Sequence, residues 1–377
     1  MNRSAWMPTK TCAVGRQRGF GLIELMVAMA IGLFLTAGIL AIYLNMSLSN
    51  AEMAKTNVQI ENGRLAIQLL REDLVHAGFW NGFIPEFDDL TLSTAPADYP
   101  AALPEPCSPD GSWTTNEMNA LLGVPVQLYS AVPAGCEVLL PDAVTGSDVL
   151  LVRHARTCVA GIGNCEADIA GALYFQTSQC EGEARYVLAD SGFTLHKRDC
   201  VMAAEKRKFV NNIYYLRDYA VTAGDGIPTL MQSSFDLAGG SLAQQPAVAM
   251  IEGVEAMRFE LGVDNISDSG AAVDYSQPVN WANPAIKNSP TNRGDGAADA
   301  HCTSATCSML NADDMANSVV IKAYLLVRSL EASPGYSSDK IYSLAGDSFG
   351  PYSDSFKRHV YMTTVRLSNI SGRRETP

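Results

Sequence analysis

The N-terminal part of the chain contains one long stretch without charge. No residue from Leu25 to Ala51 is charged, and the apolar segment Leu25–Leu44 is by itself about long enough to cross the hydrocarbon core of a bilayer. The pattern therefore predicts a segment that serves both as a membrane anchor and as a surface on which apolar helices can assemble.

The helical pattern continues beyond this stretch. No proline occurs between Phe20 and Ile84, so nothing of the usual kind forces a kink. Past Ser49, apolar residues recur at helical spacing and charged residues occupy the positions between them. We therefore expect a single helix from Phe20 to about Ala77, with Gly78 as its terminator.

The remainder of the chain predicts antiparallel β structure. Residues 79–119 are rich in Pro, Asp, Ser and Thr and indicate irregular loop. Strand-like segments follow at Val124–Tyr129, Glu137–Leu140, Asp148–Arg153, Ala172–Gln176, Ala184–Leu188 and Phe193–Lys197. Cleaner alternation of apolar and polar residues marks Met257–Val263, Val319–Val327 and Tyr361–Leu367. The expected class is α+β, a long helix on a β-rich antiparallel domain with large loop insertions, the longest being the tract Asn265–Asn317.

A basic leader precedes the charge-free stretch. Its charges are all positive and come from Arg3, Lys10, Arg16 and Arg18. Such a leader stays on the cytoplasmic side of a membrane. An ordinary secretory signal has its cleavage site after the apolar core, whereas here Gly19-Phe20 comes before it. A single acid, Glu24, stands at the head of the apolar run, where a charge is costly and is by default functional.

The set Gly19, Phe20, Leu22, Ile23, Glu24 and Leu25 resembles the type III signal sequence of type IV prepilins and of the related pseudopilins. The resemblance implies that a prepilin peptidase cuts between Gly19 and Phe20 and N-methylates Phe20. It also implies that Glu24 meets the amino terminus of a neighbouring subunit, since a carboxylate in low dielectric needs a partner. The alternative for Glu24 is that it reaches the cytoplasmic interface.

This resemblance also implies a division of the chain. Residues 1–19 would be a leader that is removed, and residues 20–78 a long N-terminal helix, of which 20–46 would form the transmembrane segment and filament core. Residues 79–377 would form a pilin-like globular domain in the periplasm. The protein would be a single-pass protein of the inner membrane before it enters a pilus at the cell surface.

Later segments narrow the resemblance to the PilW-type minor pilins of type IV pilus assembly. They are Glu61–Arg64, Ile213–Arg217, Ile251–Glu255, Tyr324–Ser329 and Thr363–Leu367. Members of that family are subunits that prime and assemble the filament together with other minor pilins and the major pilin. Two alternatives stay open: a minor pseudopilin of type II secretion, and a pilus-borne adhesin.

The charge of the chain bears on its partners. The formal net charge is −13, and removal of the leader with its four positive charges would leave −17. Because non-specific nucleic-acid binding depends on neutralising phosphates, we expect no direct nucleic-acid binding.

The cysteines indicate disulfides. One of nine, Cys12, lies in the leader, and the remaining eight are Cys107, Cys136, Cys158, Cys165, Cys180, Cys200, Cys302 and Cys307. An even number beyond a membrane anchor is typical of an oxidising compartment. Eight cysteines permit 105 connectivities. Our prediction joins neighbours: 107–136, 158–165, 180–200 and 302–307. A metal site of His301 with Cys302 and Cys307 is the rival, although the usual Cys-x2-Cys spacing is absent.

No pattern points to catalysis or to a cofactor. The five histidines stand outside any H-E-x-x-H arrangement, and there is no phosphate loop or nucleophile elbow. We expect no enzyme activity, although a triad is defined by geometry and a sequence does not exclude one. Two further features are the cluster Asp264, Asn265 and Asp268, which lacks an EF-hand register for calcium, and Arg293-Gly294-Asp295, expected on an exposed loop.

Overall fold

The computed structural model of the chain describes residues 19–304, 306 and 311–375. The chain divides into two compact units, residues 1–54 and 55–377. Helix α1 runs from Leu22 to His76 and contributes to both. It ends where the sequence predicts: Gly78 has a φ of +72°, and its amide donates to the carbonyl of Arg153 at 3.0 Å.

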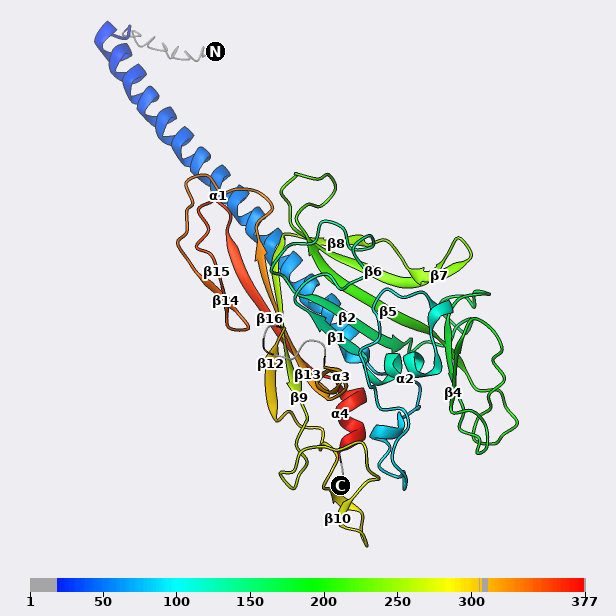
Figure 1. The fold of residues 1–377 in the computed structure, drawn as a ribbon. Coiled ribbons are helices and arrows are strands. Elements are labelled where there is room, and N and C mark those ends of the chain that lie inside the picture. Colours follow the sequence, from blue (N-terminus) through cyan, green and yellow to red (C-terminus); the bar gives the residue numbers. More distant parts are fainter. Residues whose placement is uncertain (1–18, 305, 307–310, 376–377) are drawn as a thin grey trace, which may run out of the picture. The chain divides into compact units, whose positions relative to one another are not determined.

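The second unit contains an eight-stranded and a four-stranded antiparallel sheet (Figure 1). The eight-stranded sheet has the order β1-β2-β5-β3-β4, and β6 pairs with β5, β7 and β8. Its strands are β1 (Val126–Tyr129), β2 (Val149–Ala155), β3 (Tyr174–Thr177), β4 (Tyr186–Ala189), β5 (Lys206–Arg217), β6 (Thr229–Ala238), β7 (Ser241–Gln244) and β8 (Val248–Glu252). The four-stranded sheet has the order β12-β9-β13-β16, with β9 (Val254–Val263), β12 (Ala300–Thr303), β13 (Ser318–Arg328) and β16 (Arg358–Arg366).

Short elements complete the unit. Two hairpins pair β10 (Trp281–Asn283) with β11 (Asn288–Pro290), and β14 (Tyr342–Leu344) with β15 (Asp347–Phe349). The short helices are α2 (Thr115–Gly123), α3 (Ala312–Ala316) and α4 (Ser368–Arg374), with 3-10 turns at Glu86–Asp88 and Asp110–Ser112. A capping box starts α2, because Thr114 and Glu117 each accept the other's backbone amide proton.

One core cluster joins α1 to both sheets. Ala66, Leu70 and Leu74 of α1 are fully buried against Val126 and Leu150 of the eight-stranded sheet and against strands β9 and β13 of the other. The two sheets thus share their largest apolar cluster with the second half of one helix. The predicted α+β class, with a long N-terminal helix and antiparallel sheets, is confirmed.

Several local predictions are wrong. Glu137–Leu140 forms a turn next to the disulfide-bonded Cys136, and Phe193–Lys197 is irregular apart from an isolated bridge between His196 and Ala203. The expected irregular segment 79–119 contains the start of α2. The tract Asn265–Asn317 is not structureless, because β10, β11, β12 and α3 lie within it. Short strands of polar residues carry little hydrophobic periodicity, which explains why they escape detection.

Three of the predicted disulfides are present. Cys107 is bonded to Cys136, Cys158 to Cys165 and Cys180 to Cys200, so each bridge joins neighbours in the sequence. Cys307 lies outside the described residues, and the 302–307 pairing therefore stays a prediction. The bridges close loops of the second unit, and the Cys107–Cys136 bridge packs in an apolar cluster with Tyr129 and Leu140.

Buried charges fasten the C-terminal helix. The guanidinium of Arg374 donates to Asp88 at 2.9 Å, to Asp264 at 3.2 Å and to the carbonyl of Ala316 at 3.1 Å. Asp264 also accepts from the backbone amides of Asp295 and Gly296. Burial opposes the charge of Arg374, but Asp88, Tyr275 and Asp264 together outweigh it and raise the Arg374 pKa.

This arrangement corrects two sequence interpretations. Asp264, considered above as a member of a calcium cluster, is fully buried and holds Arg374 instead. Arg293, expected on an exposed loop, is only 2% exposed and donates to the backbone carbonyls of Asp274, Asn292 and Gln277. The Arg-Gly-Asp tripeptide is therefore part of the interior scaffold of the tract.

The Arg374 network yields a stability prediction. Arg374→Met leaves Asp264 buried without a cation and Asp88 with Arg373 alone at 3.6 Å, so we expect the free energy of unfolding to fall by about 3–5 kcal/mol. The control is Arg366→Met, which removes a half-exposed ion pair with Glu375 and costs about 0–1 kcal/mol. Urea unfolding of the detergent-solubilised full chain measures both. Equal losses for the two variants contradict the prediction.

Candidate functional site

The predicted processing and assembly residues lie together at the start of α1. Gly19 and Phe20 precede the helix, and the Phe20 side chain is 88% exposed. Glu24 stands in the first turn, and its Oε2 accepts the backbone amide proton of Gly21 at 3.0 Å. An acid here suits the positive end of the helix dipole and satisfies one of the free amide groups. The structure thus gives Glu24 a local role in starting the helix.

The first unit presents an uncovered apolar surface. Every residue from Gly19 to Ala51 is exposed, among them Leu33, Phe34 and Ile39. Among the described residues, α1 is the helix that is long and apolar enough to cross a membrane, by its length and composition. Apolar surface of this extent must be covered by lipid or by other apolar helices.

The second half of α1, from Lys55 onward, is seated by polar as well as apolar contacts. Gln59 donates to the carbonyl of Val327 at 2.7 Å and to that of Lys357 at 3.0 Å. Gly63 lies so close to the ring of Tyr361 that an added Cβ would be 2.3 Å from it. The landmark segment Glu61–Arg64 therefore lies where the helix crosses β16, and its glycine permits the close approach.

A second polar contact fixes the end of α1. Asp73 accepts from Asn212 and from the hydroxyl of Tyr214, each at 3.0 Å, and lies 2.8 Å from Nε2 of His154. Burial, followed by the nearby Asp73 carboxylate, raises the pKa of Tyr214, which keeps its hydroxyl a donor. The network sets the register of the helix against β2 and β5.

Our sequence prediction missed Asp73 and its partners. The available signal was a charged residue among the buried positions Ala66, Leu70 and Leu74, at helical spacing. Such a residue must find partners on the opposing surface. Nothing in the sequence indicates which donors of the sheet would face it, since they come from residues about 80 to 140 positions later.

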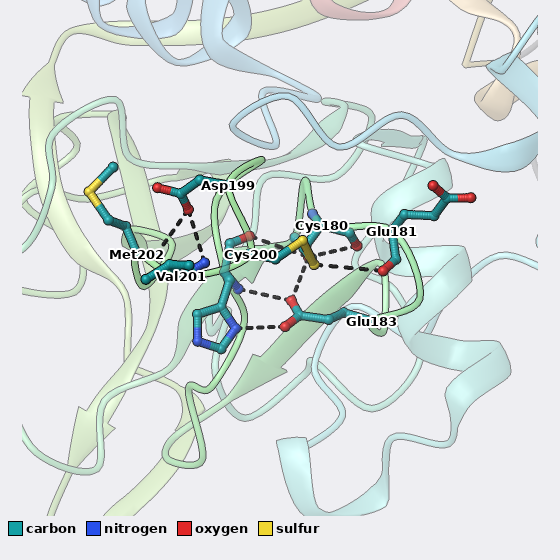
Figure 2. The surroundings of a disulfide bond; sticks show 9 residues. Cys180, Glu181, Glu183, Asp199, Cys200, Val201 and Met202 are labelled. Carbon is teal, nitrogen blue, oxygen red and sulfur yellow. Dashed lines mark hydrogen bonds and ion pairs between the residues drawn. A yellow bond between two sulfur atoms is a disulfide. The ribbon is translucent and has the colours of Figure 1, made fainter.

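The predicted cysteines are distributed over separate loops rather than gathered into one site. Figure 2 shows the Cys180–Cys200 bridge with Glu183 and Asp199 close by. Glu183 accepts from Ser178 at 2.7 Å and from the backbone amide of His196 at 2.9 Å. These hydrogen bonds lower the pKa of Glu183 to about 2. Next to Cys302, Nδ1 of His301 lies 3.3 Å from the carboxylate of Glu260, so the imidazole has a partner other than a metal.

The Glu183 site yields a pH prediction. Its folded pKa of about 2 lies below the ordinary value of 4.5, so the stabilisation is fully present above about pH 4.5. It is lost as the pH falls toward 2, and the loop closed by Cys180 and Cys200 should loosen in that window. Ser178→Ala removes the first cause of the shift, so the Glu183 midpoint in a carboxyl NMR titration should rise toward 4.5. An unchanged midpoint contradicts this explanation.

The comparisons with known proteins agree with the arrangement of these elements. Residues 15–40 match the family described as Prokaryotic N-terminal methylation motif, which includes Gly19, Phe20 and Glu24. Residues 213–369 match the family described as Type IV Pilus-assembly protein W, from β5 to the start of α4. No curated protein sequence matches the chain.

Among solved structures, a type IV-like pilin from Thermus thermophilus is similar over 82% of this chain and 96% of its own, with 11% identity and a TM-score of 0.32. The two family matches do not depend on this structural similarity. This chain is therefore similar to the type IV pilus-assembly protein W family over residues 213–369 and to the prokaryotic N-terminal methylation motif over residues 15–40.

Proposed function

We propose that this protein is a minor pilin subunit that takes part in priming and assembling type IV pili. The observation that carries the proposal is the presence, in one chain, of the methylation motif at residues 15–40 and the pilus-assembly domain at residues 213–369. The long helix supports it, because its first part is apolar and exposed while its second part belongs to a folded unit. The mechanism is assembly by helix packing and involves no turnover chemistry.

The proposal divides the chain by function. Residues 1–19 are a cytoplasmic leader that prepilin peptidase removes, and Phe20 becomes the methylated amino terminus. Residues 20–46 of the helix anchor the protein in the inner membrane and later join the filament core. Residues 79–377 form the periplasmic domain, where the disulfides Cys107–Cys136, Cys158–Cys165 and Cys180–Cys200 suit an oxidising compartment.

Glu24 has an assembly role in this proposal. Beside the amino terminus of a neighbouring subunit, its carboxylate would form an ion pair in an apolar surrounding and set the stagger between helices. The contact with the Gly21 amide holds the side chain at the start of α1, four residues from Phe20. The partners are the major pilin and other minor pilins.

Of the alternatives, the match to the pilus-assembly family favours the pilus over type II secretion. An adhesin role has less support, because the Arg-Gly-Asp tripeptide contributes a buried arginine and Asp264 is engaged by Arg374. The pilus role is therefore the function that the observations support best.

Processing gives the first test. Intact mass and N-terminal peptide mapping of the protein from its native membranes should reveal a chain that starts at N-methyl-Phe20. Gly19→Val should block cleavage and leave residues 1–19 in place. Gly32→Val is the matched control, because an added Cβ meets no atom within 4 Å at either glycine. A wild-type chain that retains Met1 would contradict the proposal.

Assembly gives the second test. We expect Glu24→Gln to be cleaved and methylated normally, yet to be recovered in sheared pili at roughly one tenth of the wild-type amount, since the loss of about 1.4 kcal/mol changes an equilibrium tenfold. Glu61→Gln, an exposed acid of the same helix, is the control and should incorporate normally. Equal incorporation of both variants argues against the pairing role of Glu24.

A further inference from the structure

Strand β16 leaves one edge of the four-stranded sheet open. Among the described residues, β16 pairs with β13 alone. Two backbone bonds fix which groups face β13: the amide of Leu367 donates to Val319, and that of Ser329 donates to Lys357. Along an antiparallel strand, the amide and carbonyl groups of successive residues point alternately toward one neighbour and away from it. Since residues 357 and 367 bond to β13, the other odd-numbered residues of β16 do so as well. The amide and carbonyl groups of Val360, Met362 and Thr364 therefore point to the free edge.

A groove of about 530 Å³ runs along this edge. It lies between the second half of α1 and β16, which Figure 1 shows running alongside each other. Ile67 and Val75 of the helix and Met362 of the strand form its apolar lining, and Met362 is 60% exposed. The hydroxyl oxygen of Tyr361, also in the lining, is buried and bonds no described residue. The groove thus combines an open strand edge with apolar contacts.

The charge of the groove differs in sign from that of the protein. Arg64 and Arg71 line it, are exposed, and form no ion pair with any residue that the structure describes. Its acid, Glu72, accepts from Gln68 of the same helix at 2.8 Å. In a chain with a net charge of −13, two arginines against one acid give this groove a formal excess of positive charge beside a free strand edge, and thus a local site for acidic groups.

We propose that this groove binds an extended acidic segment of another pilin subunit, which adds to β16 as a further antiparallel or parallel strand. The inference rests on the proposed function for the identity of the partner. Main-chain hydrogen bonds to Val360, Met362 and Thr364 would give affinity, and Arg64 and Arg71 would select acidic side chains. The exposed edge would then be covered in the assembled complex.

The same features disfavour other occupants. A helix would leave the amide and carbonyl groups of the edge unpaired, whereas a strand satisfies them. A second copy of β16 contains no acidic residue and would therefore offer Arg64 and Arg71 no partner. An acidic strand avoids both difficulties.

Site-specific photo-cross-linking tests the proposal. The full chain, with p-benzoylphenylalanine in place of Met362, is produced in membranes together with the major and minor pilins of its own assembly system. After illumination, we expect an adduct in which mass spectrometry identifies an acidic, extended segment of a pilin ectodomain. The same photoreactive group in place of Val221, a residue 85% exposed outside the groove, is the control and should give no such adduct.

Variants separate the two contributions. Thr364→Pro removes an amide that points to the free edge but removes no hydrogen bond to β13. Arg64→Glu and Arg71→Glu reverse the charge of the groove. Each should lower the adduct yield about tenfold, while Arg198→Glu, an exposed arginine elsewhere, should leave it unchanged. Thermal unfolding of each variant verifies that it folds, and the charge variants test the site even where the proline variant does not fold.

The outcomes distinguish this inference from the proposed function. Strand docking would be overturned by adducts with lipid only or by adducts with a basic or helical segment. It would also be overturned if neither the proline substitution nor the charge reversals changed the adduct yield. The N-terminus is determined in the same samples. A chain that is processed at Phe20 but forms no pilin adduct refutes the groove and leaves the pilin function intact, whereas a chain that retains residues 1–19 refutes the pilin function itself.

Discussion

The second unit depends on the burial of one stripe of α1. Ala66, Leu70 and Leu74 contact apolar residues of both sheets, and this shared cluster is the largest in the unit. Burial of apolar side chains stabilises the contact between the helix and the sheets. Gln59 and Asp73 fix the orientation of the helix, because each hydrogen-bonds to partners at defined positions on the sheets. A rotation of the helix by one residue would expose Leu70 and Leu74 and would separate Gln59 and Asp73 from their hydrogen-bond partners. The helix therefore fixes how the strands beside it are arranged.

The same helix changes its environment along its length. Up to Ala51 it is exposed and free of charge after Glu24, and from Gln59 onward it carries a buried stripe. An apolar segment without an intrachain partner is suited to lipid or to neighbouring helices, while the amphipathic segment is already satisfied within the chain. Assembly through the first segment therefore does not require the folded unit to open, which is the property that the proposed pilin role needs.

Buried charge is used in this protein for fastening. Arg374 links Asp88, Asp264 and the end of α3, and thereby ties the C-terminal helix to segments far away in sequence. Asp264 and Arg293 both belong to motifs that sequence inspection associates with ligands, yet both are occupied internally. By contrast, Arg64 and Arg71 are exposed and form no intrachain ion pair among the described residues. A charged side chain that forms no ion pair within the chain therefore marks a surface that is available to partners.

The sequence by itself determined the long helix and its end at Gly78, the α+β class and the clearly alternating strands, because each follows from local periodicity. The motif around Gly19, Phe20 and Glu24 was equally local. The prediction that neighbouring cysteines pair is confirmed for three bridges, but the structure was needed to select them among 105 connectivities. Only the tertiary structure decided which polar residues meet. The contacts of Asp73 and Arg374 and the close approach of Gly63 to Tyr361 join residues that lie 58 to 298 positions apart in the sequence. No period in a single sequence encodes such pairings, since they depend on how the sheets and the helix pack together.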